Sequence, residues 1–118
     1  MHACRLAFSL LALAAAGAVG AQAHAFLDHA SPLVGSTVAS APHEVVLTFT
    51  QSLEPAFSTV TVTDPGGADA GAGKAQVSGN TMRIGLKASG TGIYKVHWHA
   101  LSTDTHSTEG TFTFHVGK

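Results

Sequence analysis

Apolar and polar residues alternate through most of the chain after residue 40, and this pattern constrains the fold more than any other feature of the sequence. The alternation occupies residues 45–49, 60–62, 82–86, 94–100 and 112–116. Successive side chains of an extended strand point to opposite faces of a sheet, so each segment is predicted to be a half-buried β-strand. Glycine-rich turn signals separate the segments, and no helix of useful length competes with them. The sequence therefore predicts an all-β sandwich or barrel.

The N-terminal residues indicate export. Arg5 precedes a long apolar run, Leu6 to Gly20, and small residues follow in Ala21-Gln22-Ala23, which is the pattern of a secretory signal peptide. A bilayer span needs about 20 strongly apolar residues, whereas this run is shorter and is diluted by serine and glycine. We therefore expect a soluble periplasmic protein that is not embedded in the membrane.

The cleavage site decides which residue begins the mature chain. Cleavage after Ala23 satisfies the A-x-A rule and gives a signal peptide, residues 1–23, and one domain, residues 24–118, that starts with His24. The two residues that follow Ala23 allow a second A-x-A site, and cleavage there would start the chain at Phe26. The two alternatives differ in whether a histidine carries the free α-amine.

Composition excludes several classes of function. The only cysteine, Cys4, lies in the predicted signal peptide and before its apolar run, so the mature domain is expected to have no disulfide, no thiolate ligand and no lipid anchor. The formal net charge is −1 and there is no basic patch, which excludes phosphate-driven binding to nucleic acid. The chain has 8 histidines, and imidazoles in a cysteine-free exported domain favour a metal-binding function.

Two segments of the domain carry less regular patterns. Ala25 to Ala30 is predicted to be an edge strand that a proline closes, with Phe26 turned inward and His24 at its free end. Ala68 to Gly73 is predicted to be a Gly/Ala loop that offers little side chain to a ligand. Of the two, only the N-terminal strand is expected to contribute to a site.

Asp104 and His106 are the candidate functional side chains. They lie in residues 102–110, between two predicted strands, and loops on a rigid scaffold commonly carry sites. If this segment is extended, residues two apart point the same way and can present an oxygen and a nitrogen to one point. An N-terminal His24 would add its α-amine and ring Nδ1, and three nitrogens with one oxygen suit Cu(II). The alternative is an ordinary turn in which Asp104 accepts amide hydrogen bonds and His106 is merely exposed.

Three motifs occur in the order of a known family. The domain begins with H-A-F-L-D-H-A-S-P, continues with E-V-V-L-T-F-T-Q-S-L, and ends with Y-K-V-H-W-H-A-L-S-T-D-T-H-S-T-E-G-T-F-T-F-H-V. In this order they resemble CopC, the family of periplasmic copper-resistance proteins, over nearly the whole domain. The last motif is specific, because an aromatic strand, an S-x-D-x-H loop, a glycine and a second aromatic strand appear together.

The resemblance implies a Greek-key β-sandwich of about seven short strands, similar in outline to cupredoxins and immunoglobulin-like domains. It also implies a protein that binds Cu(II) through His24, Asp104 and His106 for copper sequestration, carriage or resistance, and that is not an enzyme. The partner that the resemblance suggests is a CopD-like inner-membrane protein, and we expect the chain itself to be a monomer.

The sequence departs from the family pattern in two places. Some members have an acidic residue near the Cu(II) site where this chain has Gln51, which can still accept a hydrogen bond. Some members have a Met-rich loop for Cu(I), whereas the matching residues 69–77 contain neither methionine nor histidine. Thioether ligands are what Cu(I) prefers, so a Cu(II)-only protein is expected.

The remaining histidines and two other functions compete with this hypothesis. His97 and His99 are predicted neighbours on the solvent side of a strand, where a second, weak metal site is less favoured than plain surface. His29, His43 and His115 are assigned no role. The competing functions are a small copper-brace enzyme similar to lytic polysaccharide monooxygenases and a metal-free interaction domain. An in-plane carboxylate opposes cycling to Cu(I), which disfavours the enzyme.

Overall fold

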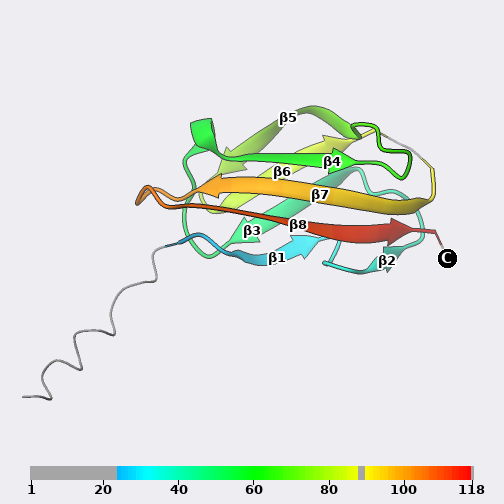
Figure 1. Ribbon diagram of the computed structural model, residues 1–118, viewed down its shortest axis with the longest axis horizontal. Helices are drawn as coiled ribbons and strands as arrows, with labels where there is room; N and C mark the ends of the chain where they lie inside the picture. Colours follow the sequence, from blue (N-terminus) through cyan, green and yellow to red (C-terminus); the bar gives the residue numbers. More distant parts are fainter. Residues whose placement is uncertain (1–23, 88–89, 118) are drawn as a thin grey trace, which may run out of the picture.

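Two four-stranded sheets form the computed structural model, which describes residues 24–87 and 90–117 (Figure 1). The first sheet has the order β1-β3-β6-β5, with β1 at Leu27–Ser31, β3 at Glu44–Phe49, β6 at Thr81–Leu86 and β5 at Gly71–Ser78. The second has the order β2-β8-β7-β4, with β2 at Thr37–Val38, β8 at Ser107–Val116, β7 at Gly92–Leu101 and β4 at Thr59–Thr63. One short 3₁₀ turn, η2 (Pro55–Phe57), precedes β4. The predicted signal peptide, residues 1–23, lies outside the described residues.

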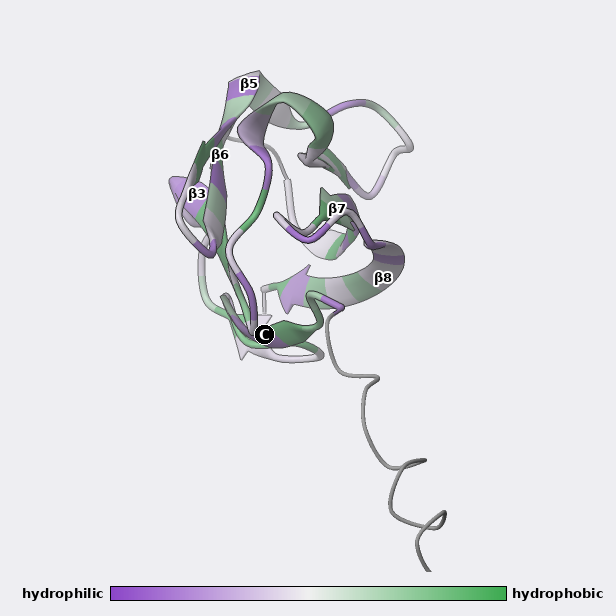
Figure 2. Ribbon diagram, turned by 90° about the vertical axis from the view of Figure 1, so that its left-hand side faces the viewer, coloured by the Kyte–Doolittle hydropathy of each residue, from purple (hydrophilic) through white to green (hydrophobic). Residues whose placement is uncertain are grey.

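The strand order confirms the predicted all-β Greek-key sandwich. Consecutive strands repeatedly change sheet, and all described strand pairs are antiparallel except β2 with β8. Viewed from the end, the sheet with β3 and β6 lies opposite the sheet with β7 and β8 (Figure 2). The described residues contain eight strands instead of about seven, since β2 has only two residues and is too short to show an alternation. No helix within residues 24–87 and 90–117 is long and apolar enough to cross a membrane.

Aromatic pairs fill the space between the sheets. Phe49 of β3 meets Trp98 of β7 edge to face, with ring centroids 5.0 Å apart, and Tyr94 stacks on Phe114 at 5.2 Å. Gly110 lies opposite Trp98 in the β7–β8 pair, and a Cβ at this position would stand 2.7 Å from Cζ2 of the indole. The glycine of the last sequence motif is therefore required by close approach of the indole ring.

Two local predictions are wrong. Phe26 was expected to face inward, but it is 54% exposed, whereas Ala25 is fully buried. A register irregularity between Leu27 and His29 reverses the inward–outward alternation within this segment, so Ala25 faces the core and Phe26 faces outward.

The second error concerns the predicted Gly/Ala loop. Its last three residues belong to β5, which pairs with β6 even though its small side chains show no alternation. The pairing is irregular between Ala72 and Gln76, and Gly73 has a φ of 88° within it. The partner strand, and not the pattern of β5 itself, makes this segment a strand.

Candidate metal centre

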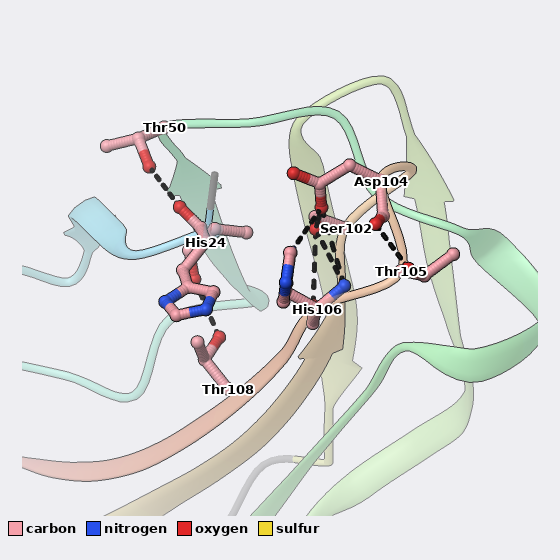
Figure 3. A network of polar contacts seen from close by, with 8 residues as sticks. His24, Thr50, Ser102, Asp104, Thr105, His106 and Thr108 are labelled. Carbon is pink, nitrogen blue, oxygen red and sulfur yellow. Dashed lines mark hydrogen bonds and ion pairs between the residues drawn. The ribbon is translucent and has the colours of Figure 1, made fainter. Parts of the chain in front are cut away.

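Three segments that are distant in the sequence meet at one end of the sandwich (Figures 1 and 3). The N-terminal residues pair with the end of β3, where the Phe26 amide donates to Thr50 Oγ1 at 3.0 Å and the Thr50 amide donates to the Phe26 carbonyl at 2.9 Å. On the other side, the Thr108 hydroxyl of β8 donates to the carbonyl of buried Ala25 at 2.6 Å. These hydrogen bonds hold His24 beside the loop that joins β7 to β8.

Ser102 organises that loop from the inside. Its side chain is buried, and its amide donates to the His106 carbonyl at 3.0 Å. The Thr105 amide donates to the Ser102 carbonyl at 2.8 Å, and Thr105 has a φ of 75°. Residues 102–106 therefore form a tight turn and not the extended segment that the sequence suggested.

The turn brings Asp104 and His106 together. His106 Nδ1 lies 3.3 Å from Asp104 Oδ1, and the same carboxylate oxygen accepts hydrogen bonds from the Ser102 hydroxyl and, at 3.4 Å, from the His106 amide. The alternative reading of the sequence is thus correct in one respect, because Asp104 does accept a backbone amide bond. Accepting this hydrogen bond does not exclude metal binding, since the side chains of Asp104 and His106 both remain partly exposed to solvent.

His24 completes the group. Its ring lies next to the His106 ring, with centroids 4.6 Å apart and planes at 73° (Figure 3). The structure therefore brings all three predicted site residues to one place. As their side chains stand, no three His, Cys, Asp or Glu residues among residues 24–87 and 90–117 are arranged to hold a metal ion. In the full chain the His24 nitrogen is also part of a peptide bond, so copper ligation stays a prediction.

The surroundings keep Asp104 ionised. The hydrogen bond from Ser102 lowers the pKa of this carboxyl below its ordinary value of 3.8, and the contacts with His106 lower it further, while partial desolvation opposes them. Asp104 is therefore negatively charged at neutral pH, which is the form that attracts a cation or a metal.

Sequence reasoning missed the residues that position the three candidates. Ser102 could have been found, because a hydroxyl two residues before an aspartate commonly bonds within a turn. Thr50 and Thr108 gave no signal, since their role depends on how distant segments pair. Gln51 is exposed, and the hydrogen bonds given by the described residues for His24, Asp104 and His106 go to other residues.

The other histidines lie elsewhere. His97 and His99 are on the outer face of β7, as predicted, and His97 Nε2 lies 3.3 Å from Glu109 Oε2. His29 pairs with its neighbour Asp28. A cleft of about 390 Å³ opens between β4 and β5, and its lining includes none of the three candidate residues.

Comparisons with known proteins agree on one family. The CopC domain matches residues 27–117. Copper resistance protein C from Pseudomonas syringae pv. tomato is 41% identical over 105 residues, covering 81% of this chain and 82% of that protein.

Solved structures give the same result. The crystal structure of CopC from Methylosinus trichosporium OB3b has a TM-score of 0.72 and 31% identity, covering 79% of this chain and 93% of that one. PcoC, a methionine-rich copper resistance protein from Escherichia coli, has a TM-score of 0.68 and 31% identity, covering 80% of this chain and 99% of that one. These matches confirm the predicted resemblance, and they show that the chain belongs to the CopC family of copper-binding and copper-resistance proteins, which are not enzymes.

Proposed function

We propose that the mature protein begins at His24 and binds one Cu(II) ion through the His24 α-amine and ring, Asp104 and His106. The contact of the His24 and His106 rings, beside an ionised Asp104, is the observation that carries this proposal. The Thr50 and Thr108 hydrogen bonds fix the backbone of Phe26 and Ala25, directly after His24, and so hold His24 beside His106.

The donor set favours Cu(II) over Cu(I). Two imidazoles, an amine and a carboxylate are borderline or hard ligands that suit the tetragonal geometry of Cu(II), whereas Cu(I) prefers thiolates and thioethers. Residues 24–118 contain no cysteine, and their single methionine, Met82, is fully buried in the core. No thioether among the described residues is therefore available to a surface Cu(I) ion.

We further propose that the protein works in the periplasm as a monomer that sequesters or carries Cu(II), contributing to copper resistance. The signal-peptide pattern of residues 1–23 supports export. A CopD-like inner-membrane protein is the partner proposed for it. An exposed metal site at one end of the sandwich suits a carrier, because a second protein can approach its ligands directly.

The test combines the mature N-terminus with metal binding. Intact mass of the exported protein is expected to show His24 as the first residue, and titration against a Cu(II) chelator is expected to show one tight site per chain. Electron paramagnetic resonance should show nitrogen coupling to the copper. A start at Phe26, or a tight stoichiometric site for Cu(I), would overturn the proposal.

A matched variant isolates the α-amine. A short Gly/Ser extension before His24 keeps the imidazole but moves the free amine away from the site. We expect this variant to lose most of its Cu(II) affinity, with His43→Ala as the control that removes an exposed histidine elsewhere. Unchanged affinity in the extended protein would show that the amine is not a ligand.

A further inference from the structure

A second group of nitrogen and oxygen donors lies on the outer face of the β2-β8-β7-β4 sheet. His97 and His99 are two residues apart in β7, so their side chains leave the same face about 6.7 Å apart along the strand. Glu109 of β8 is directly opposite His99 in the register and diagonal to His97. His97 Nε2 already lies 3.3 Å from Glu109 Oε2.

We propose that His97, His99 and Glu109, here called the strand trio, form a second and weaker site for a divalent transition-metal ion. A metal with bonds of about 2.0–2.1 Å at tetrahedral angles holds its nitrogen and oxygen donors about 3.3 Å apart, which is the separation of His97 and Glu109. As the side chains stand, the three do not surround one point. His99, which is half-exposed on the outer face of β7, has to turn toward the other two.

The neighbours of the strand trio leave room for a metal. Thr59 and Thr61 of β4 lie opposite His99 and His97, and Thr111 of β8 lies opposite His97 on the other side. These side chains are small and uncharged. The next residues on the same face of β7 are Lys95, whose ammonium has a flexible stem and can turn away, and Leu101, which is half-buried. The long β7–β8 pairing, which spans both strands, keeps the three Cα positions fixed.

The chemistry of the donors sets the affinity order. Two imidazoles and one carboxylate, with water in the open position, bind Zn(II) and Cu(II), and Cu(II) is bound more tightly by any given site of this type. The three side chains are solvent-exposed or half-exposed and must give up rotamer freedom on binding, so the strand trio is weaker than a site held by buried groups. Its donors do not include the N-terminus, so it does not depend on processing of the precursor.

The experiment removes the proposed Cu(II) site at His24, Asp104 and His106, and then measures metal binding by the strand trio. The background protein carries His106→Ala and a Gly/Ser extension before His24, and Zn(II) binding is followed by calorimetry and by the imidazole resonances. We expect one Zn(II) per chain. His97→Ala and His99→Ala should each weaken it by more than the 10- to 100-fold that is typical for losing a group that only orients a ligand. Glu109→Gln should weaken it less, and His43→Ala should leave it unchanged.

The outcomes separate this proposal from the tight Cu(II) site. Absence of Zn(II) binding in the background protein would overturn it, as would equal losses in His97→Ala and His43→Ala. All four substitutions lie on the surface, and a thermal melt of each variant checks that the sandwich remains folded. Failure of the tight site would appear only in the unextended protein with His106 intact, so each proposal can fail alone.

Discussion

The group formed by His24, Asp104 and His106, here called the loop trio, and the strand trio use the same chemistry in different surroundings. Each contains two imidazoles and one carboxylate, and each has one imidazole nitrogen 3.3 Å from a carboxylate oxygen. The loop trio is assembled from two distant segments, and a buried serine holds its carboxylate. The strand trio is set only by the register of β7 with β8.

This difference predicts that the same donor distance gives sites of different affinity. What distinguishes the loop trio is the set of hydrogen bonds around it: Ser102 holds the Asp104 carboxylate, and Thr50 and Thr108 hold the backbone directly after His24. The strand trio has no comparable support among the described side chains, so a metal must organise it. The comparison predicts a large gap in affinity, and four experiments can break or sharpen it.

The largest effect is expected for His106→Ala. Loss of this imidazole should weaken Cu(II) binding by several orders of magnitude, because it lies between Asp104 and His24 and contacts both. Competition with a Cu(II) chelator measures the change. Equal losses of affinity in His106→Ala, His97→Ala and His99→Ala would contradict the assignment of the tight Cu(II) site to the loop trio.

The second effect is the stabilisation that bound copper gives to the fold. Cu(II) at about 1,000 times its dissociation constant should add about 4 kcal/mol to the free energy of unfolding. This gain should disappear on acidification, because protons compete with the metal for the imidazole nitrogens and for the amine, which must be deprotonated to bind.

Thermal melts with and without Cu(II), from acid to mildly alkaline pH, measure this stabilisation. Copper affinity should rise with pH over the whole range. Because the pKa of Asp104 is lowered below its ordinary value of 3.8, its carboxylate stays charged near neutrality, and the change there belongs to the nitrogen ligands. A copper-induced shift in Tm as large in acid as at neutral pH contradicts ligation by the amine and imidazoles.

A smaller effect is expected for Ser102→Ala. The serine is not a proposed ligand but positions Asp104 and the His106 backbone, and loss of such a group typically weakens metal binding about 10- to 100-fold. The same substitution removes the main cause of the lowered pKa of Asp104, which should rise toward 3.8. A lowered folded pKa stabilises the fold at pH values above the ordinary pKa, and this contribution is lost as the pH falls through the folded pKa. In the variant the contribution should be smaller, because the folded pKa lies closer to the ordinary value.

Two quantities have to be measured in Ser102→Ala, the pKa of Asp104 and the Cu(II) affinity. Nuclear magnetic resonance titration of the Asp104 carboxyl gives the pKa, and chelator competition gives the Cu(II) affinity. Ser102→Thr, which keeps a hydroxyl, is the matched control. A lower affinity with an unchanged pKa would show that the serine acts on the loop backbone and not on the carboxylate.

The smallest effects are expected for His97→Ala and His99→Ala in the otherwise unchanged protein. Both residues lie on the outer face, so their loss should change the free energy of unfolding by less than about 0.5 kcal/mol and leave the tight Cu(II) site intact. Denaturant unfolding and chelator competition measure the two quantities. A clear loss at the tight site would mean that the two trios are coupled.

Alternation predicted the strands that bury one face, and it failed where side chains are small or the register is irregular. The segments that became β3, β4, β6, β7 and β8 all showed the pattern. β5 did not, because glycine and alanine give no contrast between inside and outside. The alternation predicted that Phe26 faces the core, but Phe26 is exposed, because a strict two-residue period cannot reveal the register irregularity between Leu27 and His29.

The candidate site was predicted by residue but not by geometry. The S-x-D-x-H spacing placed Asp104 and His106 together, and the structure confirms their proximity. The reason differs, since a turn with Thr105 at positive φ, and not an extended strand, joins them. Contacts such as that between Thr108 and Ala25 join residues far apart in sequence, so no local pattern could predict them.

The burial of Met82 also bears on chemical durability. Copper ions promote oxidation of exposed sulfur, which converts methionine to a polar sulfoxide and disrupts packing. In residues 24–118 the only sulfur atom belongs to Met82, and the two sheets cover it completely. Its burial keeps this one thioether out of contact with solvent and with any metal ion at the surface.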